Sequence, residues 1–302
     1  MTSLHAAPNT MAGLVQATRR LLSPNLNDEL VIVDADYTPG DTTMRLRVVP
    51  RRIGPGSVLS WREASMYVTS LDPGTSTVEV ITGYDGGADV AVPAGSVMRV
   101  NPRFTDLTLF DMLANQTASL SSPSVGLHGF ISEFVSGSVT DGFHPIPSTP
   151  DGPAASDVLR VAAVLSRPGS GQDWVRVTNY SASLSPSNPY VRVFDDSLAH
   201  QIVYAVRIRR PLSFDDDVVA LGLPETAVDI PPLGVAALLM QGQEARRAHQ
   251  RVQGDPRRAE DVPITGALGV ARDLRRIYED RVNEEYARLQ RFLPTVFTGG
   301  TV

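Results

Sequence analysis

The last fifth of the chain places the strongest constraint on its fold, because residues 264–293 read as one long helix with a narrow apolar stripe. The apolar residues recur at gaps of three or four, which keeps them on one face of a helix. They are Ala271, Leu274, Tyr278, Val282, Tyr286, Leu289 and Leu293. The other faces are crowded with charge. Such a helix packs on one side and offers the rest to water or to other subunits.

The charged side chains of this helix are candidates for contacts between subunits. They are Arg272, Arg275, Arg276, Glu279, Asp280, Arg281, Glu284, Glu285 and Arg288. Opposite charges four residues apart give the expected pairs Arg275/Glu279, Arg276/Asp280, Arg281/Glu285 and Glu284/Arg288. Each pair of this kind adds only about 0.2–0.5 kcal/mol to helix stability, so the pairs support the helix without deciding assembly.

Composition excludes several kinds of chemistry. The chain has neither lysine nor cysteine, which removes Schiff bases, phosphate-loop lysines, disulfides and thiolate ligands. The exclusive use of arginine fits a GC-rich genome, with selection for bidentate interface pairs as the alternative. A net charge of −6 argues against a dedicated nucleic-acid binder. No apolar run approaches the roughly 20 residues that span a bilayer, and the N-terminus does not resemble a secretory signal.

Apolar periodicity and turn residues divide the 302 residues into helical and β-rich stretches. Before the long helix, we expect helices at 11–22, with Thr10 as its N-cap, and at 103–120 and 233–252. Short strands separated by turn signals cover about 29–100 and 158–208, which suggests small barrels or sandwiches. The Ser-, Gly- and Pro-rich residues 123–157 read as a linker or an irregular arm.

The expected fold class is therefore α+β, a helical bundle core with a long C-terminal helix and two inserted β-barrel or sandwich-like modules. The helical core would comprise residues 1–27, 103–122 and 232–302. Residues 28–102 would form the first β module. Residues 123–231 would form the arm and the second β module.

No arrangement of residues indicates catalysis. The five histidines are scattered, and no pair has the spacing of metal ligands on a helix. The acidic runs 195–196 and 215–217 read as solvated turns or caps, with a calcium or magnesium site as the alternative. Residues 83–87 read as a hairpin turn, because they match no phosphate-loop pattern. We expect a protein that is not an enzyme and has no cofactor and no metal site.

Three blocks of sequence resemble one protein family. They read GYDG at 83–86 with AGSVMRVNPRF at 94–104, VVALGLP at 218–224 with LGVAALLM at 233–240, and RRIYEDRVNEEYARL at 275–289. In order and spacing, the blocks resemble the head–tail adaptors of tailed bacteriophages, also called connector or head-completion proteins. The first is similar to the β-to-helix junction of those proteins, and the third to their long last helix. The chain is larger than the simple adaptors, because it adds two β modules.

The resemblance implies a virion structural protein at the head–tail junction. It implies a homo-oligomeric ring of about twelve copies. The ring would sit beneath the portal protein, join neck or tail-terminator proteins and let double-stranded DNA pass through its lumen. It also implies no contact with a membrane, and a location in the virion and, during assembly, in the host cytoplasm.

By analogy with adaptor C-termini, the end of the chain is expected to dock on the portal. The docking residues would be Phe292, Leu293, Pro294, Val296 and Phe297. A tail that is folded back on its own subunit or disordered is the alternative.

Four aromatic residues keep a second function open. Trp61, Tyr84, Trp174 and Tyr180 would suit a sugar-binding platform on a β module, although such residues more often pack in or beside cores. The alternative function is therefore a β-rich tail or baseplate protein that binds carbohydrate.

Overall fold

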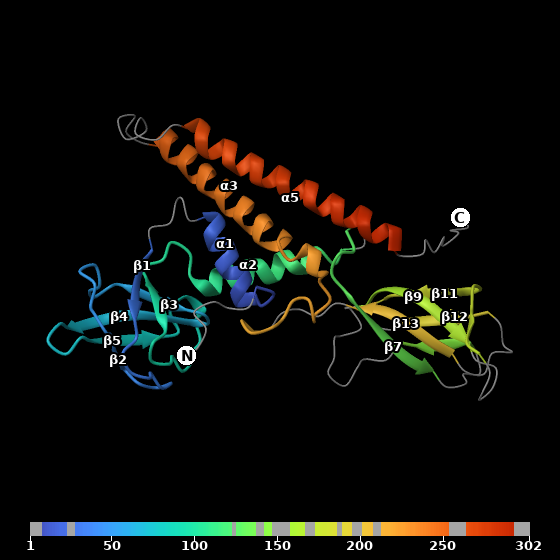
Figure 1. Cartoon of the computed structure of the whole chain (residues 1–302), viewed down its shortest axis with the longest axis horizontal. Helices are drawn as coiled ribbons and strands as arrows, with labels where there is room; N and C mark the ends of the chain where they lie inside the picture. The colour runs from blue at the N-terminus through green and yellow to red at the C-terminus, as the bar shows by residue number, and fades with distance from the viewer. Residues whose placement is uncertain are drawn as a thin grey trace. The chain divides into compact units, whose positions relative to one another are not determined.

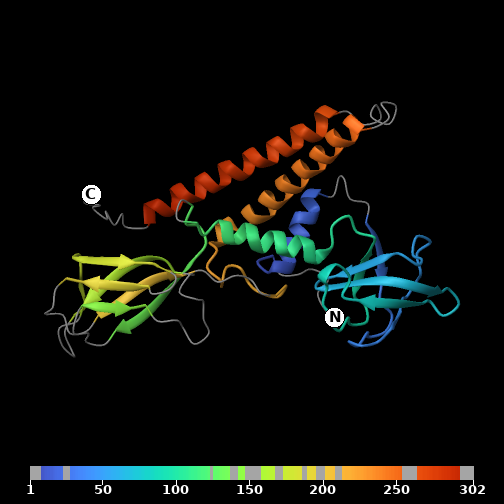
Figure 2. The ribbon, with the colours of Figure 1, turned by 180° about the vertical axis from the view of Figure 1, so that it is seen from behind.

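The structure is a computed structural model of the chain, and it divides into two compact units. It describes residues 8–22, 28–122, 125–136, 142–146, 158–166, 173–185, 189–194, 201–207, 213–253 and 264–292. The first unit comprises Met1–Gln116, Leu212–Asp216 and Asp229–Asp280, and the second comprises Thr117–Pro211, Asp217–Val228 and Arg281–Val302. Figures 1 and 2 show the elements of both units from opposite sides.

The first unit contains a curled six-stranded antiparallel sheet that forms half of a barrel (Figure 1). Its strands are β1 (Glu29–Ile32), β2 (Thr43–Arg45), β3 (Val58–Trp61), β4 (Ala64–Asp72), β5 (Thr77–Thr82) and β6 (Val97–Val100), in the order β1-β6-β3-β4-β5-β2. The two edges approach each other where Val33 bridges to Leu46. There the Asp34 amide donates to the Arg45 carbonyl at 2.9 Å. These bonds between the edges account for the curl.

Alternating side chains of these strands build the core inside the curl. In β5, Val78 and Val80 are buried while Glu79 and Ile81 are exposed, as the period of two in a strand requires. The buried cluster also draws on the other five strands and their connections, and includes Val31, Met44, Leu59, Met66, Val92 and Met98. All six strands fall within the β-rich stretch at about 29–100 that the sequence predicts.

The described helices also lie close to their predicted positions. They are α1 (Met11–Leu22), α2 (Asp106–Ser119), α3 (Ile230–Gln253) and α5 (Ile264–Phe292). Pro231 and Pro232 occupy the first turn of α3, where proline costs no hydrogen bond. In both views α3 runs beside α5 (Figures 1 and 2).

These helices are not a bundle core, so the expected fold class is wrong, and the fold is mixed α/β. Among the side chains of α5 that the structure describes, only Ala271 and Glu285 are buried. The described side chains of α5 span about 21 residues, 269–289. A helix that buries so narrow a strip covers one side of its neighbours and cannot form the centre of a bundle.

The second unit contains two antiparallel sheets. Strands β7 (Phe130–Ser136), β9 (Val158–Ser166), β10 (Val175–Arg176) and β13 (Gln201–Arg207) form one sheet in the order β10-β9-β13-β7. Strands β8 (Phe143–Pro145), β11 (Tyr180–Ser183) and β12 (Tyr190–Val193) form the other, in the order β11-β12-β8. Buried residues from both sheets and their connections make one cluster: Ile146, Val158, Val164, Val177, Val191 and Val193.

The prediction of a linker at 123–157 is wrong for two segments. Strand β7 pairs with β13 along its whole length, from Phe130 opposite Arg207 to Ser136 opposite Gln201. Farther on, His144 lies in β8 and is buried. Serine and glycine content signals local turns, whereas these strands form because a partner strand distant in sequence supplies their hydrogen bonds.

Candidate interaction surfaces on α5 and the curled sheet

A glycine in α3 sets how closely α5 packs in the first unit. A Cβ atom at Gly234 would lie 2.8 Å from the Gln116 amide and 3.0 Å from the Tyr278 ring. The Gln116 Nε2 atom donates to the Tyr278 hydroxyl at 2.6 Å. Burial raises the pKa of that hydroxyl, so it remains protonated. Tyr278 of the apolar stripe is therefore packed inside the first unit, against α2 and α3, whereas Tyr286 of the same stripe is 39% exposed.

Beside this stripe, α5 presents a face that its own unit leaves open. Val270 and Ile277 are 47% and 43% exposed, and Asp273 and Asp280 are also exposed. The four residues are spaced i, i+3, i+7 and i+10, which places them together at 3.6 residues per turn. We call them the acidic face of α5. Sequence reasoning missed its two aliphatic residues, although their seven-residue spacing off the main stripe was a readable signal.

Arginines dominate the exposed face next to it. Arg275 Nε donates to Glu279 at 2.9 Å, which confirms one predicted pair. Arg276 lies 3.8 Å from Asp273, so the predicted pair with Asp280 does not form. These side chains are more than half exposed, and solvent screening leaves such pairs with little net effect on stability.

In the second unit, charges of α5 are used within the chain. Glu285 is only 3% exposed and accepts hydrogen bonds from Arg288 Nε at 2.7 Å and from the Thr226 hydroxyl at 3.0 Å. Arg281 lies 3.7 Å from Glu285, which confirms that predicted pair, and donates to Glu284 at 2.6 Å. Arg288 pairs with Glu285 in place of the predicted Glu284. Arg281, Glu285 and Arg288 thus hold Thr226 in their own unit.

The predicted docking tail lies almost wholly outside the described residues. Leu293, Pro294, Val296 and Phe297 are not described, and Phe292 is described only as the last residue of α5. Its role remains a prediction.

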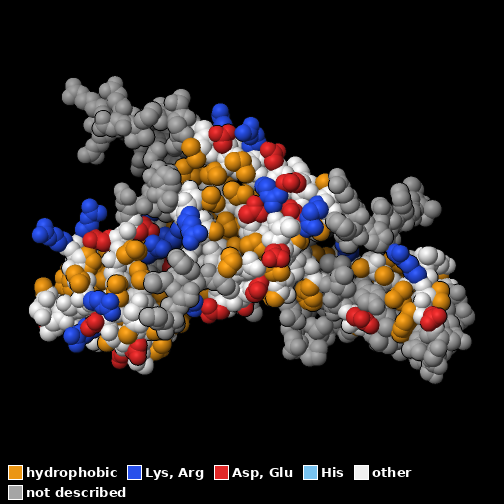
Figure 3. Space-filling view, viewed as in Figure 1, with side chains coloured by type: hydrophobic (Ala, Val, Ile, Leu, Met, Phe, Trp, Pro, Cys, Tyr) orange, Lys and Arg blue, Asp and Glu red, His pale blue; other side chains and the backbone are white. Residues whose placement is uncertain are grey.

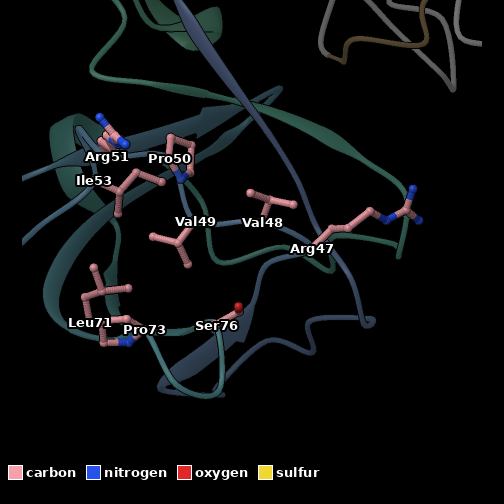
Figure 4. A pocket seen from close by; sticks show the side chains of 9 residues that line it. All are labelled: Arg47, Val48, Val49, Pro50, Arg51, Ile53, Leu71, Pro73 and Ser76. Carbon is pink, nitrogen blue, oxygen red and sulfur yellow. The ribbon is translucent and has the colours of Figure 1, made fainter.

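The curled sheet carries an open hollow of about 460 Å³. Its lining residues are Arg47, Val48, Val49, Pro50, Arg51, Ile53, Leu71, Pro73 and Ser76. In Figure 4, Val49, Ile53 and Leu71 surround a common space, and Arg47 and Arg51 lie at its two ends. Val48 is 69% exposed and Ile53 is buried, so the apolar lining reaches from the surface to the core.

Hydrogen bonds hold the walls of the hollow in place. The Leu46 amide donates to the Ser76 carbonyl at 2.9 Å. The Asp72 carboxylate accepts from the Thr75 hydroxyl at 2.8 Å and from the Gly74 amide at 2.9 Å, which closes the turn at one rim. The bond from Thr75, followed by that from Gly74, lowers the pKa of Asp72. These bonds fix the two segments that line the hollow.

A buried cluster of charges joins the helices of the first unit to its sheet. Arg19, on α1, binds Asp28 at 2.9 Å and Asp106 at 2.6 Å. Arg99 lies 3.7 Å and 3.8 Å from the same two carboxylates. The two positive and two negative charges cancel, and all four side chains contact one another between the helices and the sheet. Sequence reasoning missed this cluster, because its members come from separate elements and share no local pattern.

The three aspartates at 215–217 serve as turn and cap residues. Asp215 pairs with Arg62 at 3.0 Å, and the Asp216 carbonyl accepts from the Met11 amide at the start of α1. Asp217 accepts from the Val219 amide at 2.8 Å. In the part of the chain that is described, no group of three or more His, Asp or Glu side chains is placed to hold a metal ion.

The aromatic residues considered for sugar binding lie in different settings. Trp61 packs half-buried against the core of the curled sheet, and Tyr84 stacks on Tyr67 with ring centroids 5.7 Å apart. Tyr180 packs against the core of the second unit, whereas Trp174 is exposed.

No protein-family model matches this sequence, and no curated protein matches it. The described helices include none with the length and hydrophobicity to cross a membrane. A functional assignment therefore depends on the three sequence blocks and on the surfaces described above.

Proposed function

We propose that this chain is a structural protein of a tailed bacteriophage that forms a ring at the head–tail junction. About twelve copies would dock beneath the portal protein and offer a surface to neck or tail-terminator proteins. Double-stranded DNA would pass through the lumen without sequence-specific contacts. The protein would act by assembly in the host cytoplasm and remain in the virion, without catalysis.

The observation that supports this proposal most is the open face of α5. Two aliphatic side chains, Val270 and Ile277, are nearly half exposed beside charged residues, on a helix that packs its own unit through Ala271 and Tyr278. Leu238 on α3 is exposed as well, and Figure 3 shows apolar side chains gathered over α3 and α5. Apolar patches rimmed by charge are typical of protein–protein interfaces.

Parts of the three sequence blocks that resemble adaptor proteins lie in or next to the packed helices α2, α3 and α5. Gly234, in the second block, allows the close approach of α3 to Tyr278 in the third block. The first block covers β6 and leads into α2. The second and third blocks therefore meet where α3 packs against α5, which supports a role for α5 in assembly.

Mass measurement of the purified protein, alone and with the portal protein of the same virus, tests the proposal. We expect a portal complex that carries a ring of added copies, even if the free protein is a monomer. Deleting residues 294–302 should abolish portal binding and leave circular dichroism unchanged. A full-length chain that does not bind the portal would contradict the assignment, and portal binding by the truncation would contradict only the docking tail.

The alternative is a tail or baseplate protein that binds carbohydrate. Two exposed aromatic residues favour this alternative. Tyr84 and Trp174 present exposed rings, one in each unit. A glycan array distinguishes the two functions. A sugar that is bound by the full chain and lost in Tyr84→Ala or Trp174→Ala would favour carbohydrate binding.

A further inference from the structure

Two surfaces of the first unit are chemically complementary. The acidic face of α5 carries two aliphatic side chains and two carboxylates, Asp273 and Asp280. The hollow of the curled sheet has aliphatic walls, and two arginines, Arg47 and Arg51, stand at its ends (Figure 4). A helix that presents apolar anchors to a groove, with opposite charges at the rim, is a recurrent mode of protein recognition.

We propose that the acidic face of α5 in one copy binds in the hollow of the curled sheet of the next copy. Val270 and Ile277 enter the apolar part of the hollow, while Asp273 pairs with Arg51 and Asp280 pairs with Arg47. This contact depends on the proposed ring and names the surfaces that would build it.

The charges on both surfaces are available for such a contact. Arg51 makes no ion pair within the described chain. Arg47 approaches Asp34 only at 4.0 Å, and Asp273 approaches Arg276 only at 3.8 Å. Pairing across an interface that excludes water would give these groups shorter, charge-assisted hydrogen bonds.

The apolar lining favours a protein segment over a phosphate group as the occupant. Val48, Val49, Ile53 and Leu71 offer contacts that an anion alone cannot use. A second copy is the occupant whose chemistry is already present in this chain. Both surfaces are open in a single copy, because Val270 and Ile277 are exposed and the hollow is unfilled by the described side chains.

A contact between two unlike surfaces has a consequence for assembly. A copy that binds through its acidic face still has its hollow free for another copy. A copy that binds through its hollow still has its acidic face free. Such heterologous contacts repeat until a ring closes. A two-fold dimer would instead use the same surface on both copies.

The absence of cysteine allows a direct cross-linking test. We would prepare Ile277→Cys and Val49→Cys as single variants and as a double variant, assemble each on the portal and oxidise it mildly. We expect a ladder of covalent multimers from the double variant. The two single variants, carrying tags of different size, should give one mixed dimer and no larger product. Ile277→Cys with Arg52→Cys is the matched control, since Arg52 is exposed but does not line the hollow.

Charge exchange provides a second measurement that does not depend on disulfide geometry. Arg51→Glu should weaken self-association at least tenfold, and adding Asp273→Arg in the same chain should restore most of it. Arg52→Glu should have no effect. Melting curves of all variants would identify any that fail to fold.

Several outcomes would overturn the contact. The first is that Ile277→Cys cross-links only to Ile277→Cys of another copy. The second is that Arg51→Glu assembles normally. The third is that Arg272→Glu, on the neighbouring exposed face of α5, restores the self-association that Asp273→Arg weakens. If rings form on the portal with this contact absent, the inference fails and the proposed function stands. If the unmodified chain remains monomeric with the portal present, both fail.

Discussion

Gly222 is a position where the backbone of the second unit tolerates no side chain. It has a φ of +101°, and a Cβ atom there would lie 2.5 Å from the carbonyl carbon of Gly129. The Gly129 amide donates to the Gly222 carbonyl at 3.0 Å, which holds the two segments together. The glycine is required by a close backbone approach as well as by its own dihedral angles.

Gly222→Ala should lower the free energy of unfolding by at least about 3 kcal/mol, the sum of backbone strain and overpacking. Gly126→Ala is the control, because Gly126 also has a positive φ but would place its Cβ in open space. It should cost only about 1–2 kcal/mol. Urea unfolding measures both, and equal losses would mean that the contact with Gly129 is unimportant.

His128 should make the second unit sensitive to acid. It is buried with Nε2 3.2 Å from the Leu221 carbonyl, and burial lowers its pKa below the ordinary 6.5 while neighbouring carbonyls oppose the shift. The unfolded chain therefore binds a proton at higher pH than the folded chain. The stability contribution is complete above pH 6.5 and is lost as pH falls toward the folded pKa.

We expect unfolding free energy to fall between pH 7.5 and 5.5, by at most about 1.4 kcal/mol per pH unit from His128. His128→Gln should reduce this slope. Burial lowers the pKa of His144 as well, so some slope should remain. A slope unchanged in His128→Gln would contradict the assignment.

At the level of whole elements, Asp106 connects two helices to the curled sheet. It begins α2, and its carboxylate accepts from Arg19 of α1 at 2.6 Å and from the Arg62 amide in the β3–β4 turn at 3.2 Å. Its own amide donates to Ser60 at 3.1 Å. One carboxylate thus fixes the position of three elements within the first unit.

Asp106→Ala should destabilise the first unit by about 3–5 kcal/mol, because it leaves the buried Arg19 without half of its counter-charge. Asp111→Ala, at an exposed position of the same helix, should change stability by less than about 0.5 kcal/mol. Thermal and urea unfolding would give both values. Similar effects of the two substitutions would show that the charge cluster contributes little.

For the whole molecule, the proposed contact between copies predicts sensitivity to salt. The charged groups at its rim interact through partly exposed pairs, and the screening length falls from about 8 Å at physiological salt to about 3 Å at 1 M. Self-association on the portal should weaken several-fold over that range, without vanishing, because apolar contacts persist. Mass photometry at graded NaCl concentrations would measure it, with the melting temperature of the free chain as control. Association that strengthens with salt would indicate an apolar contact alone.

The sequence predicted those features that depend on neighbours along the chain. The helix Met11–Leu22 forms where its periodicity indicates, and Thr10 caps it, with the Gly13 amide donating to the Thr10 hydroxyl at 3.2 Å. The six strands of the curled sheet also follow local alternation and turn residues. Patterns of this kind survive in the fold because backbone hydrogen bonding and side-chain direction repeat every few residues.

Features that join distant residues were decided by the tertiary structure. The strand β7 was read as part of a linker or irregular arm, the helices were expected to form a bundle core, and the Asp106 cluster was not foreseen. The acidic face of α5 was visible as charge, but the exposure of Val270 and Ile277 depends on which side of α5 packs against α2 and α3. The hollow exists because two turns far apart in the sequence meet at one rim. Local periodicity specifies which faces a segment has, whereas burial against partners distant in the chain determines which face remains open to bind.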